Sequence, residues 1–93
     1  MTFDDLGLKK EILTAITELG FETPMPVQQQ TIPFIFERKE DLVVLAQTGT
    51  GKTAAFGLPT LNKIDLNAKY TQALVLSPTR ELAIQITEEA NKF

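Results

Sequence analysis

The sequence contains no cysteine and no histidine. Without cysteine, these 93 residues can form no disulfide, no thiolate metal site and no thiol nucleophile. Without histidine, imidazole acid–base catalysis and histidine-bound metals are excluded as well. No apolar run approaches the roughly 20 residues of a membrane-spanning helix, and Met1–Asp5 lacks the basic start of a signal peptide. We therefore expect a cytoplasmic protein without a membrane partner.

An electropositive surface is also missing. Nine Lys and Arg residues face twelve Asp and Glu residues, which gives a net charge of −3. The densest charged run, 37–41, mixes both signs and is typical of a solvated turn, whereas a phosphate-binding surface usually needs a basic stripe. Composition alone therefore does not suggest a nucleic-acid partner. The apolar fraction of 43% is that of an ordinary globular chain.

Helical periodicity dominates the first third of the chain. Apolar residues recur at helical spacing over 8–19 and predict an amphipathic helix, with Gly20 at its left-handed end. Pro24 and Pro26 stiffen the connection that follows. Pro26 is well placed as the first residue of a second helix that runs to about Phe36.

The remaining pattern alternates strands and helices. Aliphatic runs at 42–46 and 73–76 predict two parallel strands buried on both faces. Helices are predicted from Lys52 to about Ile64, and after Thr79, which can cap the last one. This order indicates an α/β fold with a parallel sheet. Two strands do not make a stable covered sheet, so we expect a chain cut from a larger domain.

The strongest motif lies between the first strand and its helix. Gly49 and Gly51 let the backbone approach an anion, the helix start adds a positive dipole end, and Lys52 adds a full charge for the phosphates. The Thr53 hydroxyl is a hard oxygen ligand suited to Mg²⁺. The alternative is a Gly/Thr-rich turn that only joins a strand to a helix. The predicted P-loop comprises Ala46, Gln47, Thr48, Gly49, Thr50, Gly51, Lys52 and Thr53.

Three motifs, namely 20–28, the predicted P-loop and 78–83, follow one another as in DEAD-box RNA helicases, which the chain resembles. The segment 20–28 resembles the Q motif of that family, Phe3 stands where the family has an isolated aromatic residue, and 78–83 resembles its first RNA-contacting motif after the P-loop. The resemblance implies the N-terminal part of a RecA-like P-loop NTPase domain, with a parallel sheet flanked by helices. Residues 1–36 would form the Q-motif region and 37–93 the start of the ATP-binding domain.

The resemblance also implies roles for single residues. Gln28 would read adenine, because its amide both donates and accepts and so matches the N6 amino group and N7, whereas guanine presents two acceptors. Phe3 would stack on the adenine, and Lys52 and Thr53 would serve catalysis. The backbone of RNA would be contacted by Pro78, Thr79 and Arg80, at a helix start that favours phosphate.

Each of these residues could also have a purely structural role. Gln28 could be a surface residue of its helix, Phe3 a core aromatic, and Arg80 the partner of a neighbouring carboxylate. Met25 departs from the family pattern, which usually has Ser or Thr there to cap the following helix, at a cost of about 1 kcal/mol if it is a cap.

The namesake Asp-Glu-Ala-Asp sequence does not occur in these 93 residues. The resemblance predicts that the parent protein is an ATP-dependent RNA helicase that binds ATP, Mg²⁺ and RNA and unwinds short duplexes. The chain alone is expected to hydrolyse no ATP and to pack loosely. Two alternatives remain: a fragment of another P-loop ATPase, and a truncated, non-catalytic product that binds nucleotide or RNA.

Overall fold

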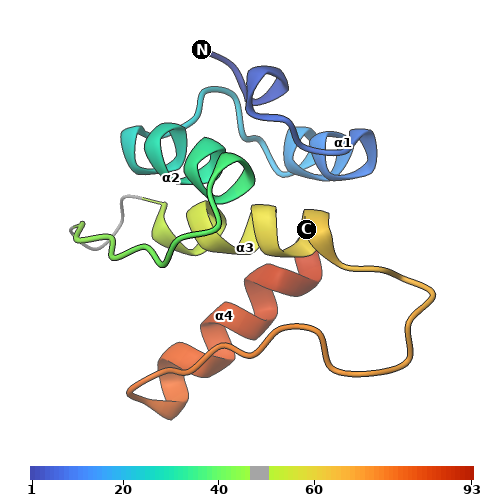
Figure 1. The fold of residues 1–93 in the computed structure, drawn as a ribbon, viewed down its shortest axis with the longest axis vertical. Coiled ribbons are helices and arrows are strands. Elements are labelled where there is room, and N and C mark those ends of the chain that lie inside the picture. The colour runs from blue at the N-terminus through green and yellow to red at the C-terminus, as the bar shows by residue number, and fades with distance from the viewer. Residues whose placement is uncertain (47–50) are drawn as a thin grey trace.

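The fold is known from a computed structural model that describes residues 1–46 and 51–93. A short 3₁₀ helix, η1 (Phe3–Leu6), precedes four α-helices: α1 (Lys10–Glu18), α2 (Pro26–Glu37), α3 (Lys52–Lys63) and α4 (Arg80–Lys92). In Figure 1, η1, α1 and α2 form an upper layer over α3, and α4 crosses below α3. Residues 38–46 after α2 and residues 64–79 between α3 and α4 contain no regular helix or strand. No helix in the described ranges is long and apolar enough to cross a bilayer.

The predicted helices form close to their expected boundaries. The first begins two residues later than its apolar stripe, because Lys9 takes an extended N-cap conformation and Leu8 turns into the core. Gly20 has φ 89°, the left-handed conformation predicted for the residue after a helix. Pro26 is the first residue of α2, and the Thr79 hydroxyl accepts from the Leu82 amide as the predicted cap of α4.

The core lies between the N-terminal helices and α3. Ile16 of α1, Ile32 of α2 and Leu58 of α3 are almost fully buried against one another. Burying an aliphatic side chain of this size contributes about 1.5–3 kcal/mol, so these contacts fasten the first 37 residues onto α3. The other members of the core cluster are Phe3, Leu6, Leu8 and Ala54. The core therefore holds the predicted Q-motif region against the helix that follows the predicted P-loop.

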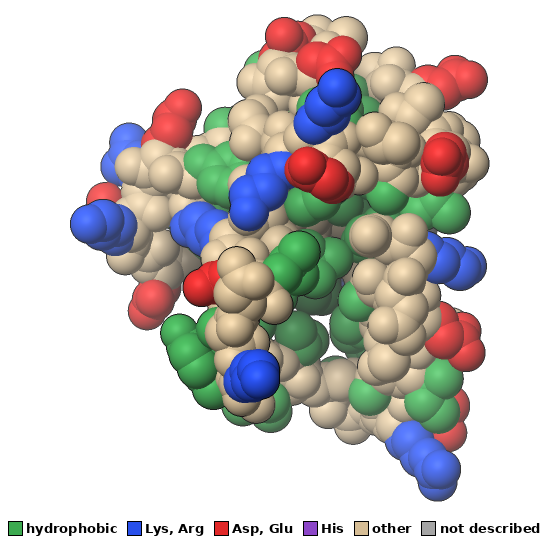
Figure 2. All heavy atoms as spheres, turned by 90° about the vertical axis from the view of Figure 1, so that its right-hand side faces the viewer, with side chains coloured by type: hydrophobic (Ala, Val, Ile, Leu, Met, Phe, Trp, Pro, Cys, Tyr) green, Lys and Arg blue, Asp and Glu red, His purple; other side chains and the backbone are tan. Residues whose placement is uncertain are grey.

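A cavity of about 1250 Å³ opens on the other side of α3. Its walls are mainly α3, α4 and segment 73–76, and Gln28 and Thr31 of α2 also line it. In Figure 2, apolar side chains surround a hollow in the lower half of the face shown. No residue of α4 is buried, and its apolar stripe lines the cavity through Leu82, Ile86 and Phe93. This side of α3 therefore has an apolar lining but no packed core.

The two predicted strands are not formed within the described residues. Segments 42–46 and 73–76 have no strand pairing. Val43 is 85% exposed and Leu45 93%, where burial was predicted. The reason is physical: a parallel strand is stabilised only by hydrogen-bonded neighbours and by cover on both faces. The fold class stands, as an incomplete α/β domain whose helices are in place.

Candidate nucleotide-binding site

The start of α3 has the geometry of an anion site. Gly51 is its N-cap with φ 85°, and Lys52 and Thr53 open the first turn, which contains no acidic residue. The free N–H groups and positive dipole end of α3 are therefore not neutralised by a carboxylate of that turn. The other predicted P-loop residues, Gln47, Thr48, Gly49 and Thr50, lie outside the described residues.

Lys52 bridges the two sides of the predicted loop. Its side chain is exposed, and its Nζ donates to the carbonyl oxygen of Ala46 at 2.8 Å. Within the described part of the chain, no carboxylate forms an ion pair with Lys52. A lysine held only by a carbonyl keeps its full charge available and can exchange that bond for a phosphate oxygen.

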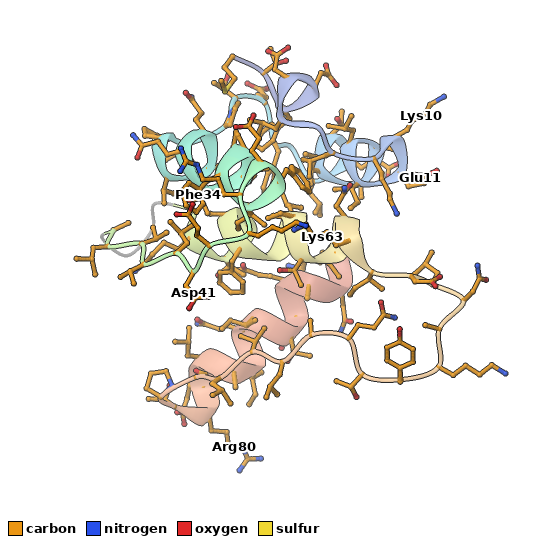
Figure 3. All side chains as sticks on the ribbon, in the orientation of Figure 1. Lys10, Glu11, Phe34, Asp41, Lys63 and Arg80 are labelled. Carbon is orange, nitrogen blue, oxygen red and sulfur yellow. The ribbon has the colours of Figure 1, made fainter. Side chains whose placement is uncertain are left out.

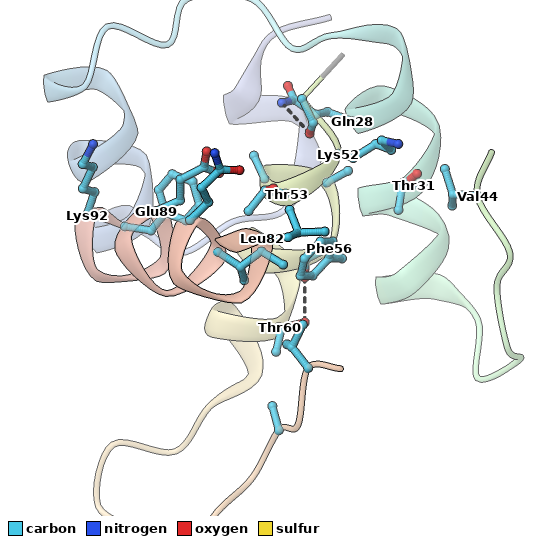
Figure 4. A pocket seen from close by; sticks show the side chains of 18 of the residues that line it. Gln28, Thr31, Val44, Lys52, Thr53, Phe56, Thr60, Leu82, Glu89 and Lys92 are labelled. Atoms are coloured by element: carbon cyan, nitrogen blue, oxygen red, sulfur yellow. Dashed lines mark hydrogen bonds between the residues drawn. The ribbon is translucent and has the colours of Figure 1, made fainter. Parts of the chain in front are cut away.

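Gln28 is the most constrained polar side chain near this loop. It is 3% exposed, so the interpretation as a surface residue of α2 is wrong. Its Oε1 accepts from the Met25 amide at 2.9 Å, and its Nε2 donates to the Gly51 carbonyl at 3.3 Å. Met25 has no side-chain capping bond, but Gln28, the third residue of α2, accepts from the Met25 N–H, which is the other half of a capping box. Figure 4 shows the Gln28 amide beside the start of α3.

The contact between Gln28 and Gly51 leaves no room for a side chain at position 51. A Cβ atom there would lie 2.5 Å from Gln28 Nε2 and 3.3 Å from Met25 Cγ. Position 51 thus requires glycine both for its positive φ and for the close approach of α2. The sequence predicts the first requirement through the P-loop pattern but contains no sign of the second.

Polar residues beside Gln28 line one end of the cavity. Thr31 lies one turn along α2 and is 5% exposed, and half-buried Thr53 lies on the facing side of α3. Both border the same cavity as Gln28 and Lys52. Thr31 was not predicted as a site residue, although its spacing of three from Gln28 puts both on one helix face.

Phe3 lies in the core cluster, as the second interpretation of that residue allowed. It is 6% exposed, and its ring centroid is 5.9 Å from that of Phe21. Phe21 in turn makes an edge contact with Phe93 at 6.0 Å. These rings connect the start of the chain with the end of α4, and they leave little of the Phe3 ring open for a ligand.

Pro78, Thr79 and Arg80 lie together at the start of α4 and are all exposed. Figure 3 shows Arg80 pointing away from the other helices. The ion pair with a carboxylate that the sequence left open for Arg80 does not form among the described residues. The guanidinium is therefore placed beside a helix N-terminus whose remaining N–H groups face solvent.

The sequence of this chain is similar to that of known helicases. The family described as DEAD/DEAH box helicase matches residues 25–93, which is most of the chain. The chain belongs to the DEAD/DEAH box helicase family. An ATP-dependent RNA helicase DeaD of Klebsiella pneumoniae is 53% identical over 92 residues, covering 99% of this chain and 14% of that protein. A DEAD-box ATP-dependent RNA helicase CshA of Geobacillus kaustophilus is 52% identical over 92 residues and covers 99% of this chain.

Solved structures of this helicase family resemble the fold closely. A DEAD box protein from the hyperthermophile Methanococcus jannaschii has a TM-score of 0.93 at 40% identity, over 99% of this chain and 25% of that one. Dbp5 of S. cerevisiae bound to RNA and ADP BeF3 has a TM-score of 0.93 at 36% identity, over 98% of this chain and 24% of that one. The chain spans only 14–20% of the length of the curated relatives named above.

Proposed function

We propose that this chain is the part of a cytoplasmic DEAD-box RNA helicase that binds ATP and recognises its adenine base. The helicase uses ATP to unwind short RNA duplexes. Residues 1–36 serve as its Q-motif region and 37–93 as the start of its ATP-binding domain. Relatives named ATP-dependent RNA helicases, and a structural neighbour bound to RNA and ADP BeF3, support the whole activity. The observation that carries the proposal for this chain is the buried, oriented amide of Gln28.

The two internal bonds of Gln28 fix which end of its amide is oxygen and which is nitrogen. If the amide were flipped, Oε1 would face the Gly51 carbonyl and the NH₂ group would face the Met25 N–H, and both pairs repel. In the fixed orientation, one N–H of Nε2 and one lone pair of Oε1 remain free. These match N7 and the N6 amino group of adenine. Guanine would present its O6 acceptor to the free lone pair of Oε1, a mispairing that costs about 1–3 kcal/mol, or roughly 5- to 150-fold in affinity.

The phosphates bind at the start of α3 in this proposal. Lys52 leaves the Ala46 carbonyl for the β- and γ-phosphates, and the N–H groups after Gly51 receive the remaining oxygens. The Thr53 hydroxyl, in the first turn of α3, would hold Mg²⁺ together with the phosphates, and the ion would supply charge stabilisation there.

RNA binds at the start of α4, through its backbone. Arg80 supplies the charge, and Thr79 and Pro78 shape the turn that precedes the helix. Contacts to phosphate and sugar carry no base information, which suits an enzyme that acts on many duplexes. Phe3 would have to release part of its contact with Phe21 to stack on adenine, so its role as a stacking residue is the most demanding part of the proposal.

Nucleotide affinities of the full-length protein test the proposal. We expect ATP to bind about 5- to 150-fold more tightly than GTP, and Gln28→Ala to remove that preference. Lys52→Ala should weaken ATP and GTP alike, because it removes a phosphate contact that both share. Equal affinity for ATP and GTP in the wild type would refute base reading by Gln28. Unchanged affinity in Lys52→Ala would refute the P-loop.

A non-catalytic role remains the second candidate for residues 1–93 by themselves. The observation that favours it is the absence of the Asp-Glu-Ala-Asp sequence, whose carboxylates position Mg²⁺ and the attacking water in the family. We expect the isolated chain to show no ATP hydrolysis above background, with or without RNA. RNA-stimulated release of phosphate by the isolated chain would contradict this expectation.

A further inference from the structure

Two polar side chains at the far end of α3, Asn62 and Lys63, contact the N-terminal helices. Half-buried Asn62 lies in the last turn of α3, and its Oδ1 accepts from the backbone N–H of Lys9 at 2.6 Å. Lys9 is the N-cap of α1 and has no side-chain capping bond. The N–H groups at a helix start have no partner within the helix. Asn62 therefore supplies, from 53 residues away, an acceptor that the start of α1 lacks.

Lys63 makes the complementary contact with the end of α2. Its Nζ donates to the carbonyl oxygen of Ile35 at 3.1 Å and lies 6.0 Å from the centroid of the Phe36 ring. The carbonyl of Ile35 belongs to the last turn of α2, where carbonyls have no partner within the helix. A cation at this end also matches the negative end of the helix dipole. Figure 3 shows Lys63 between α2 and α3.

These two residues hold the N-terminal helices from the end of α3 opposite the nucleotide site. Asn62 holds the start of α1, and Lys63 holds the end of α2. At the other end of α3, Gly51 is joined to Gln28 at 3.3 Å. The two ends are separated by about 16 Å of helix, at 1.5 Å per residue. The buried contact of Ile32 with the core fixes how deeply α2 sits, but apolar contacts are non-directional and fix its rotation poorly. The bond from Gln28 to Gly51 at one end of α2 and the bond from Lys63 to Ile35 at the other fix that rotation, and with it the place of the Gln28 amide.

We propose that Asn62 and Lys63 are positioning residues for adenine selectivity. They keep α1 and α2 in the register on α3 that places the Gln28 amide against Gly51. This inference rests on the proposed reading of adenine by Gln28 and extends it to two residues that contact no nucleotide. Lys63 carries the larger share, because it bonds α2, the helix of Gln28, directly, whereas Asn62 acts through α1.

The test compares three ligands on the full-length protein: ATP, GTP and inorganic tripolyphosphate. Asn62→Leu keeps the side-chain size but loses the acceptor, and Asn62→Asp keeps an oxygen acceptor. Lys63→Met and Lys63→Arg form the second pair, and Lys10→Met is the control, since Lys10 points away from the molecule in Figure 3. A net hydrogen bond changes an equilibrium by about 2- to 12-fold.

We expect Lys63→Met to lower the ATP-over-GTP preference by about 3- to 10-fold and Asn62→Leu by less, both without weakening tripolyphosphate. Asn62→Asp and Lys63→Arg should restore the preference, and Lys10→Met should leave it unchanged. A preference that survives in the Asn62→Leu, Lys63→Met double variant overturns the inference. Parallel losses for all three ligands overturn it too, because they indicate general destabilisation. A wild type without any ATP preference instead refutes the proposed function on which the inference rests.

Discussion

Gly51→Ala tests the closest approach between the predicted Q-motif region and the predicted P-loop. The new methyl group carries two separate costs. A left-handed φ, here 85°, costs a residue with a side chain about 1–2 kcal/mol. The Cβ would also lie 2.5 Å from Gln28 Nε2, so the buried amide must move and lose its bond to Gly51, at about 1–3 kcal/mol. We expect a total of about 2–5 kcal/mol.

The chain offers a matched control in Gly20. Its φ of 89° is nearly the same, but a Cβ at that position has no atom within 4 Å. Gly20→Ala should therefore show the conformational cost alone, about 1–2 kcal/mol. The difference between the two variants isolates the contact with Gln28.

Hydrogen exchange of peptides from α2 and α3, in the full-length protein, measures these costs as local opening free energies. Gly51→Ala should speed exchange by about 30-fold or more, and Gly20→Ala by about 5- to 30-fold in its own segment. A second variant completes the cycle: in a Gln28→Ala background, Gly51→Ala should cost only the conformational part. Equal effects of Gly51→Ala with and without Gln28 would refute the steric reasoning.

Three further expectations concern stability. Thr79→Ala removes the cap of α4 and should cost about 1 kcal/mol, seen as exchange of the Leu82 amide about five times faster, while Thr79→Ser keeps the bond. The bonds from the Thr2 backbone N–H and hydroxyl lower the pKa of Asp5 below its ordinary value. Asp5 therefore stabilises η1 fully above the pKa that its carboxyl has in the unfolded chain, and this stabilisation is lost as the pH falls through the lower pKa of the folded state. Asp5→Asn should flatten this pH dependence. An Asp5 carboxyl that titrates by NMR at or above its ordinary pKa would contradict the expectation. Leu58→Ala, at 0% exposure, should cost about 2–5 kcal/mol in urea unfolding of the full-length protein, against less than about 0.5 kcal/mol for Leu66→Ala at 93% exposure.

The helices could be predicted from the sequence because their signals are local. The apolar spacing of α1, Pro26 at the start of α2 and Thr79 before α4 each act within one or two turns of the chain. The strands at 42–46 and 73–76 have equally clear sequences, but a parallel strand depends on neighbours far along the chain. Their exposure in this chain shows that an apolar run favours burial, but that other parts of the fold must supply the surface that buries it.

The site divides in the same way. The phosphate-binding start of α3 follows from the glycines and Lys52, because backbone N–H groups and one charge suffice to define it. The burial of Gln28 could not be decided from Gln28, Gln29 and Gln30, since only packing of α2 on α3 determines which of the three faces inward. Asn62 and Lys63 carried no sequence signal, because polar residues at a helix end are common and their partners lie 53 and 28 residues away.

The span of the Lys9–Asn62 contact also bears on the order in which the chain folds. That contact joins residues 53 apart, whereas Gln28 and Gly51 are 23 apart. Closing the longer loop first costs about 0.7 kcal/mol more chain entropy than closing the shorter one, so we expect α2 to dock on α3 before the N-terminal segment attaches. The segment that carries Phe3 is then the last part to be fastened in folding and the first to be released in unfolding. Loss of the Asn62 contact should accordingly speed unfolding and leave the folding rate nearly unchanged.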